Sequence, residues 1–169
     1  MLLKMLRERK RSSAVAGLDT IGTPAEPGLH RFTEQAAQAF VSPISLLTLI
    51  HDDRLWVKAS TGLDMQCLPR QDGFCSYVVE RADMLEVCDA LADPFFRTLP
   101  PVTGDPHIRY YLGAPLTLAG GMDVGALCVL DTKPRESASR DQRAYLAGLA
   151  RQAATMLEHR ARTKGSLAA

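Results

Sequence analysis

The stretch 107–131 constrains most strongly what this chain can fold into. Within it, two short apolar segments, 110–118 and 124–130, flank a turn that contains Gly120 and Gly121. Because glycine adopts a positive φ without steric cost, these two residues suit a tight reversal between strands. The flanking segments are too short for helices and are rich in Tyr, Leu and Val, so we predict a β-hairpin.

The hairpin segments are apolar nearly throughout and do not alternate between apolar and polar residues. That pattern is typical of strands that are covered on both faces. Gly113 and Gly125 lie inside the two segments, where a missing side chain indicates a bulge or the close packing of another element. We therefore place the hairpin in the middle of a sheet that carries helices on both sides.

Composition and charge exclude several classes of protein. A chain of 169 residues suits one domain that buries about 70% of the surface exposed when unfolded. Its net charge of +1 favours neither acidic nor basic partners. No apolar run approaches the roughly 20 residues of a membrane span. Met1-Leu2-Leu3 precedes the basic residues, which reverses the order of a secretory signal. We therefore expect a cytoplasmic protein.

The cysteines and histidines give no sign of a metal site. The four cysteines form no C-x-x-C pair; they are Cys67, Cys75, Cys88 and Cys128. The four histidines are scattered as well, whereas a zinc site needs clustered ligands. We expect reduced, mostly buried thiols, with no metal ion and no cofactor. The sequence leaves open whether Cys75, Cys88 and Cys128 converge in space.

The residues before the hairpin predict a basic arm and a series of short elements. The arm covers 1–13 and lacks the aromatic or groove-reading residues that nucleic-acid binding needs. A helix is predicted to start at Thr23-Pro24 and to run to Phe40. Its first turn is weakened by Pro27-Gly28, so its regular part begins nearer His30. Next we predict strands over 44–50 and 55–59, a polar loop over 62–73, a helix over 74–81 and a strand over 84–87.

Later segments predict two further helices and a loop. Asp93-Pro94 suits the N-cap and first residue of a short helix. The segment 99–106 holds three prolines and is predicted to be a loop that acts as a lid. Ser139-x-x-Gln142 is a capping box that opens a last helix of about six turns. The apolar stripe of that helix is Leu146, Leu149, Ala150, Ala153, Met156 and Leu157. Residues 164–169 are predicted to be a flexible tail.

Several motifs recur along the chain in a fixed order. They are Phe74-Cys75, the segments 87–94, 101–104, 108–116 and 125–131, and Pro134-Arg135. This set resembles the GAF domain family, in particular the bacterial GAF domains found in front of histidine kinases and diguanylate cyclases. The likeness extends upstream to residues 17–20 and to Trp56, so we identify 14–163 as a single GAF domain. The resemblance implies an α+β fold in α/β/α layers, with helices on both faces of a central antiparallel β-sheet.

The resemblance also implies a ligand pocket between the central strands and the segments 74–81 and 89–96. The candidate ligand-binding residues are Phe74, Cys75, Tyr77, Asp89, Asp93, Phe96, Arg109 and Tyr111. Each has a structural interpretation as well: the aspartates suit helix caps, Arg109 suits an ion pair, and the aromatic residues suit the core. No set of nucleophile, base and orienting residue is recognisable, so we predict no catalytic residue.

Specialised GAF roles find little support in the residues. The Asn-Lys-x-Phe-Asp-Glu signature of cyclic-nucleotide-binding members is absent. Cys75 lacks the His that usually accompanies the chromophore-attaching Cys of bilin-binding members. Free methionine-R-sulfoxide reductases are GAF enzymes of similar length and form the enzymatic alternative. Where close relatives carry Arg and His, this chain has Phe95 and Tyr77, so its ligand is apolar or aromatic, or side chains fill its pocket.

We therefore predict a stand-alone, non-enzymatic GAF domain that senses an unidentified small molecule or regulates a signalling partner protein. The further alternative is a GAF dimerisation module with a degenerate pocket. The stripe on the last helix and the apolar residues Leu2, Leu3, Met5 and Leu6 predict a homodimer through the terminal helices. We expect no nucleic-acid and no membrane partner.

Overall fold

Six strands form one antiparallel sheet in the computed structural model, which describes residues 1–168 of the chain. Across the sheet they are β3 (Cys67–Pro69), β2 (Arg54–Thr61), β1 (Ile44–His51), β6 (Asp123–Asp131), β5 (Tyr110–Thr117) and β4 (Leu85–Val87). The predicted hairpin is β5–β6, and it lies inside the sheet with β1 on one side and β4 on the other. The prediction of a central hairpin is confirmed.

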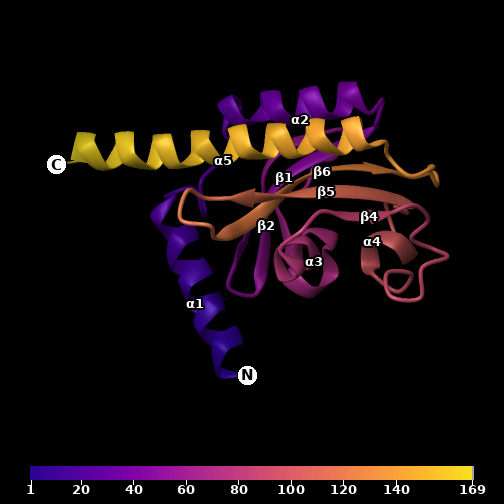
Figure 1. Ribbon diagram of the computed structural model, residues 1–169, viewed down its shortest axis with the longest axis horizontal. Coiled ribbons are helices and arrows are strands. Elements are labelled where there is room, and N and C mark those ends of the chain that lie inside the picture. Colours follow the sequence, from indigo (N-terminus) through magenta and orange to yellow (C-terminus); the bar gives the residue numbers. More distant parts are fainter. Residues whose placement is uncertain (169) are drawn as a thin grey trace.

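Helices cover both faces of this sheet (Figure 1). On one face α2 (Pro27–Ala39) and α5 (Arg140–Ala168) run side by side. On the other side lie α3 (Phe74–Arg81) and the short α4 (Pro100–Thr103). Because both faces are covered, nearly every residue of β1 and β6 is buried, which explains why their sequences do not alternate. The predicted α+β fold is confirmed.

Close packing explains why two positions in the hairpin strands are glycine. A side chain on Gly125 would collide with the backbone carbonyl of Thr48, so the missing side chain lets β6 lie close to β1. On β5 the phenol ring of Tyr111 lies over Gly113 and occupies the space that a side chain there would need. At the turn, Gly121 has a φ of +83°. The structure confirms close packing at the two strand glycines.

The start of α2 differs from the prediction. The helix begins at Pro27 rather than at Thr23-Pro24, because Glu26 has the extended backbone of an N-cap and Pro27 follows as the first helical residue. Thr23 serves another purpose: its backbone carbonyl accepts a hydrogen bond of 2.8 Å from the buried Lys58 ammonium. The predicted helix start is therefore wrong. Both Thr23-Pro24 and Glu26-Pro27 have the sequence of an N-cap followed by a first helical proline, and sequence alone does not decide between them.

Short regular elements lie within two predicted loops, and turns replace one predicted helix. The segment 62–73 contains β3 and the single turn of 3-10 helix η1 (Arg70–Asp72), because β3 pairs with the free edge of β2. The segment 99–106 contains α4, whose first residue is Pro100. After Asp93-Pro94 the chain forms turns rather than the predicted helix. These corrections leave the order of the longer elements unchanged.

Both terminal segments are helical, and the inner part of each helix packs on the domain (Figure 1). α1 (Leu2–Gly17) includes most of the predicted arm 1–13, and its Arg11 and Val15 are fully buried against the body. α5 opens with the predicted capping box: Ser139 and Gln142 bond to each other's backbone N–H groups at 2.8 and 3.1 Å. α5 then runs to Ala168, through most of the predicted tail 164–169, and residue 169 lies outside the described part.

Candidate functional site

Aromatic side chains fill the space between α3 and the sheet, where the sequence places the ligand pocket. The ring of Phe74, at the start of α3, stacks on Tyr111 of β5 at 4.9 Å and on Phe96 at 5.2 Å between centroids. Tyr77 and Phe95 close the cluster with edge-on contacts to Phe96 at 5.4 and 4.8 Å. The structure thus brings together four predicted aromatic site residues, and their rings pack against each other.

A cavity of about 40 Å³ remains beside this cluster. Apolar residues of the sheet, α3 and two loops line it, together with Thr48 and two thiols. Pockets for metabolites and drug-sized ligands occupy about 300–1,000 Å³. Of the predicted aromatic site residues, Phe74 and Tyr111 line this cavity and Tyr77 and Phe96 do not, so the packed rings occupy the place where the sequence puts the pocket.

Two of the four cysteines meet at this cavity. Cys75, in the first turn of α3, and Cys128, on β6, have their sulfur atoms 3.7 Å apart, and both residues are buried. The Tyr111 hydroxyl donates a hydrogen bond of 3.2 Å to the Cys75 sulfur. The hydrogen bond with Cys128, helped by Thr48 and Tyr111, lowers the pKa of Cys75 against the opposing effect of burial. Burial raises the pKa of Cys128 well above its usual value, so Cys75 is the more acidic of the two thiols.

The other two cysteines lie elsewhere. Cys67 is on the edge strand β3, and Cys88 follows β4 at the opposite edge of the sheet. Burial raises the pKa of the Cys88 thiol. Convergence is thus limited to Cys75 and Cys128. Within residues 1–168 no three His, Cys, Asp or Glu side chains are arranged to hold a metal ion. None of the helices described there is both long and apolar enough to cross a bilayer.

The polar candidates bond to nearby backbone. The Asp89 carboxylate accepts a bond of 3.1 Å from the N–H of Leu91, and Asp93 accepts bonds of 2.8 and 3.2 Å from the two N–H groups of residues 95 and 96. Arg109 donates to two carbonyls, of Val102 and Ile108, both at 3.0 Å. None of these three side chains lines the cavity. They stabilise the turns before α4 and the loop after it, and the two aspartates bond within turns rather than at the helix caps expected for them.

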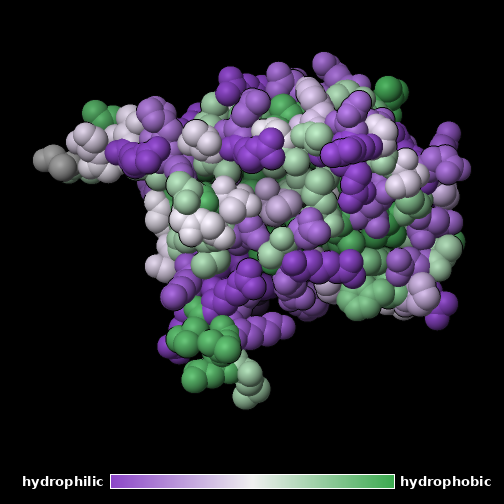
Figure 2. All heavy atoms as spheres, viewed as in Figure 1, coloured by the Kyte–Doolittle hydropathy of each residue, from purple (hydrophilic) through white to green (hydrophobic). Residues whose placement is uncertain are grey.

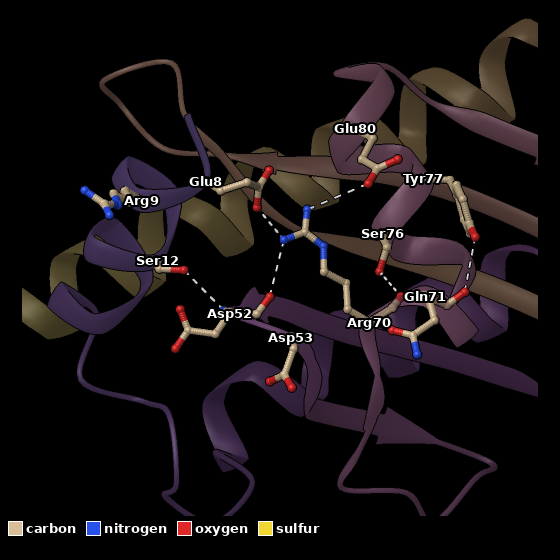
Figure 3. Close-up of a pocket in the computed structure, with 10 residues that line it drawn as sticks. All are labelled: Glu8, Arg9, Ser12, Asp52, Asp53, Arg70, Gln71, Ser76, Tyr77 and Glu80. Carbon is tan, nitrogen blue, oxygen red and sulfur yellow. Dashed lines mark hydrogen bonds and ion pairs between the residues drawn. The ribbon is translucent and has the colours of Figure 1, made fainter. Parts of the chain in front are cut away.

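A surface groove of about 620 Å³ lies between α1 and α3 (Figure 3). It also takes in the β1–β2 turn and η1, and its lining residues are mostly charged or polar. The sequence did not reveal this groove, because its walls come from four separate segments. The one sequence feature that points to this groove is Glu8, the single acidic residue in the basic stretch 1–13.

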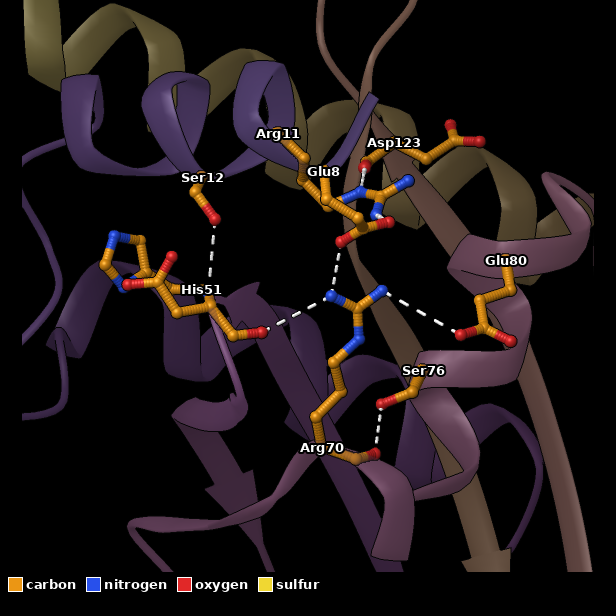
Figure 4. Close-up of polar contacts among 9 residues, drawn as sticks. Glu8, Arg11, Ser12, His51, Arg70, Ser76, Glu80 and Asp123 are labelled. Carbon is orange, nitrogen blue, oxygen red and sulfur yellow. Dashed lines mark hydrogen bonds and ion pairs between the residues drawn. The ribbon is translucent and has the colours of Figure 1, made fainter. Parts of the chain in front are cut away.

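Three charged residues of this groove, Glu8, Arg70 and Glu80, form ion pairs with one another (Figure 4). The Glu8 carboxylate accepts hydrogen bonds from both Arg11 and Arg70. Arg11 also donates 2.8 Å to the Asp123 carbonyl at the start of β6, and Arg70 lies 3.9 Å from Glu80 on α3. Partial burial would raise the pKa of Glu8, but the bonds from Arg70 and Arg11 outweigh it and lower the pKa to about 2. The network fastens α1 to the sheet and to η1.

Together, the fold and these sites define a small α+β domain with two helices on one sheet face and a closed, aromatic-lined site on the other. The chain belongs to the GAF domain family, whose profile matches residues 24–157.

Among curated proteins, the chain is 38% identical over 155 residues to the cyclic di-GMP phosphodiesterase PA2567 of Pseudomonas aeruginosa. The match covers 92% of this chain and 24% of that protein, so the chain spans about a quarter of its relative's length.

Solved structures share the fold. One is the GAF domain of an Acinetobacter phosphoenolpyruvate-protein phosphotransferase, with 19% identity, a TM-score of 0.68 and coverage of 97% of this chain and 98% of that one. Another is the free methionine-R-sulfoxide reductase of Neisseria meningitidis in complex with its substrate, with 17% identity, a TM-score of 0.63 and coverage of 93% and 89%.

Proposed function

We propose that this chain is a non-enzymatic, cytoplasmic regulatory GAF module of signal transduction in which its own side chains close the family's pocket. The observation that carries this proposal is the stack of Phe74, Phe96 and Tyr111 beside a cavity of only about 40 Å³. The similarity to a cyclic di-GMP phosphodiesterase supports a signalling context. Among the predicted roles, the geometry favours the degenerate pocket over the sensor of a small metabolite.

Native mass spectrometry of the protein purified from its own host tests the closed pocket. We expect a mass that is accounted for by polypeptide chains with no bound small molecule, because no space for a metabolite exists between α3 and β5. The matched variant is Phe96→Ala, which removes one ring from the stack and opens a cavity there. Binding of a small aromatic probe by the variant but not by the wild type supports the proposal. A co-purifying metabolite in the wild type contradicts it.

The enzymatic alternative is reduction of free methionine-R-sulfoxide. The Neisseria reductase shares the fold at 17% identity, which supports the architecture alone. A substrate of that size has no room beside Cys75 and Cys128, and Cys67 and Cys88 lie at opposite edges of the sheet. We therefore expect no turnover of free methionine sulfoxide with dithiothreitol as reductant. Turnover that is lost in Cys75→Ser would establish the alternative.

We further propose a homodimer, formed through α1. The stripe of α5 is not available for pairing, since Leu146, Leu149 and Leu157 are buried in the domain's own core. The exposed apolar residues gather instead at the N-terminal end of α1, which projects from the body (Figure 2). They are Met1, Leu2, Leu3, Met5 and Leu6. Pairing two copies of this helix removes the patch from water.

Light scattering at tens of micromolar protein tests the dimer. We expect a dimer mass for the wild type and a monomer mass for the double variant Leu3→Asp and Leu6→Asp. Leu91→Asp is the matched control, because Leu91 is an exposed leucine outside α1. A monomeric wild type contradicts the proposal.

A further inference from the structure

The pair Cys75 and Cys128 serves no part of the function proposed above. The two residues lie on different elements and are far apart in sequence, yet their sulfur atoms are 3.7 Å apart. We propose that they form a redox modification site: hydrogen peroxide oxidises this dithiol to a disulfide within the folded domain, and a thiol reductant restores it. The inference goes beyond the regulatory role, because it depends only on the chemistry of these two side chains.

The two sulfur atoms need to move only a short distance to form a disulfide. A disulfide bond is about 2.0 Å long, so the sulfurs need to approach by about 1.7 Å. The cavity of about 40 Å³ is lined by both cysteines, so side-chain rotation into the bonded geometry meets open space. Cys128 is fixed on β6 between two neighbouring strands, whereas Cys75 lies in the first turn of α3. We therefore expect Cys75 to make most of the movement.

The surroundings of the two sulfurs assign their roles. Cys75 accepts a hydrogen bond of 3.2 Å from the Tyr111 hydroxyl and lies at the positive end of the α3 dipole, and both features stabilise a thiolate. The pKa of Cys75 is lowered accordingly. Cys128 keeps its proton, since burial raises its pKa. Cys75 is thus the attacking sulfur and Cys128 the resolving sulfur.

The reaction balances in two steps. The Cys75 thiolate attacks one peroxide oxygen; an S–O bond forms, the O–O bond breaks, and the products are a Cys75 sulfenic acid and hydroxide. The Cys128 sulfur then attacks the sulfenic sulfur; the S–S bond forms, the S–O bond breaks, and the Cys128 proton leaves with the hydroxyl group as water. The hydroxide of the first step takes up the proton that Cys75 had released. Overall, two thiols and one peroxide give a disulfide and two waters.

The cavity selects a small oxidant. A water molecule needs about 10–15 Å³ of such space, so about 40 Å³ admits hydrogen peroxide but not a hydroperoxide with a bulky organic group. Several lining residues are partly exposed, which puts the cavity just beneath the surface; they are Leu63, Met65, Leu68, Pro101 and Pro106. Oxidation also changes the surroundings, because the Tyr111 hydroxyl loses its thiolate acceptor while its ring remains stacked on Phe74.

Thiol counting on the full chain tests the proposal. The reduced protein is exposed to hydrogen peroxide, unfolded, alkylated with N-ethylmaleimide and examined by intact mass and peptide mapping. We expect four labelled cysteines before oxidation and two afterwards, with the Cys75 and Cys128 peptides linked and both labels restored by dithiothreitol. Four labels after oxidation, or a link that involves Cys67 or Cys88, would overturn the proposal. This measurement needs no variant and is independent of any signalling assay.

Variants and a second oxidant test the assigned roles. In Cys128→Ser we expect a Cys75 sulfenic acid that dimedone traps, and in Cys67→Ser, the matched control, we expect the unchanged link. Cumene hydroperoxide should form the link at least about tenfold more slowly than hydrogen peroxide, and Tyr111→Phe should slow it about tenfold by weakening the thiolate. Equal rates with both oxidants would rule out the cavity as the route to the sulfurs.

Discussion

The carboxylate of Glu8 accepts a hydrogen bond from the guanidinium of Arg70, 62 positions further along the chain. This contact, shared with Arg11, fixes the N-terminal helix on the GAF domain (Figure 4). It converts a segment whose sequence indicates only a basic arm into a packed element.

Arg70→Met should release the N-terminal half of α1. The variant leaves Glu8 with Arg11 alone, and the loss of a partly buried charged pair costs about 1 kcal/mol. We expect faster hydrogen exchange over residues 2–10 with little change in β1 or β6. Glu80→Gln is the control, because Glu80 is 3.9 Å from Arg70 and its loss should leave exchange nearly unchanged.

The same contact makes α1 docking sensitive to acid. The pKa of Glu8 is about 2 in the folded protein against an ordinary 4.5, so its contribution is complete above about pH 4.5 and is lost as the pH falls toward 2. Limited proteolysis of α1 over that range measures the loss. In Glu8→Gln the cleavage rate should no longer carry this acid dependence; an unchanged dependence would assign it to another group.

Gly113→Ala should destabilise the domain by about 1–3 kcal/mol. The added methyl group would collide with the phenol ring of Tyr111 and push it against Phe74 and Cys75. Urea unfolding measures the change. Gly120→Ala is the matched control, since no atom lies near its added methyl group. Adding Tyr111→Phe to Gly113→Ala should recover part of the loss; without any recovery, Tyr111 is not the source of the strain.

Val41→Asn should stabilise the domain by about 1 kcal/mol. Val41 has a φ of +47° just past the end of α2, where its N–H and that of Ser42 satisfy the carbonyls of Gln38 and Ala37. A β-branched residue is strained there, whereas asparagine tolerates this conformation. Thermal unfolding should show a higher Tm. Leu91→Asn, at an exposed site of ordinary φ, should show no gain.

Leu157→Asp should unfold the domain, whereas Met156→Asp should be tolerated. Leu157 is on the side of α5 that faces the core and is fully buried, whereas Met156 is only partly buried at the edge of the core. A buried, unpaired carboxylate costs several kcal/mol. Circular dichroism and urea unfolding distinguish the two variants. Similar stabilities would mean that the α5 stripe faces solvent in the isolated chain.

The sequence by itself determined most of the elements and their order. The hairpin follows from its glycine turn and apolar strands, α3 from the spacing of Phe74, Tyr77 and Val78, and the start of α5 from Ser139 and Gln142. These signals are local: each depends on residues a few positions apart, whose backbone conformation they control directly. Where two local signals compete, as Pro24 and Pro27 do before α2, local sequence does not decide which of them starts the helix.

Only the tertiary structure decided the state of the pocket and the partners of its thiols. The eight candidate site residues were named from the sequence, but whether aromatic rings line a pocket or fill it depends on side-chain directions across several elements. Cys75 and Cys128 meet only because α3 packs on β6, and Glu8 meets Arg70 only because α1 packs on β1 and β6. Such contacts arise from close packing of distant segments, and close packing has no signature in the spacing of residues along a chain.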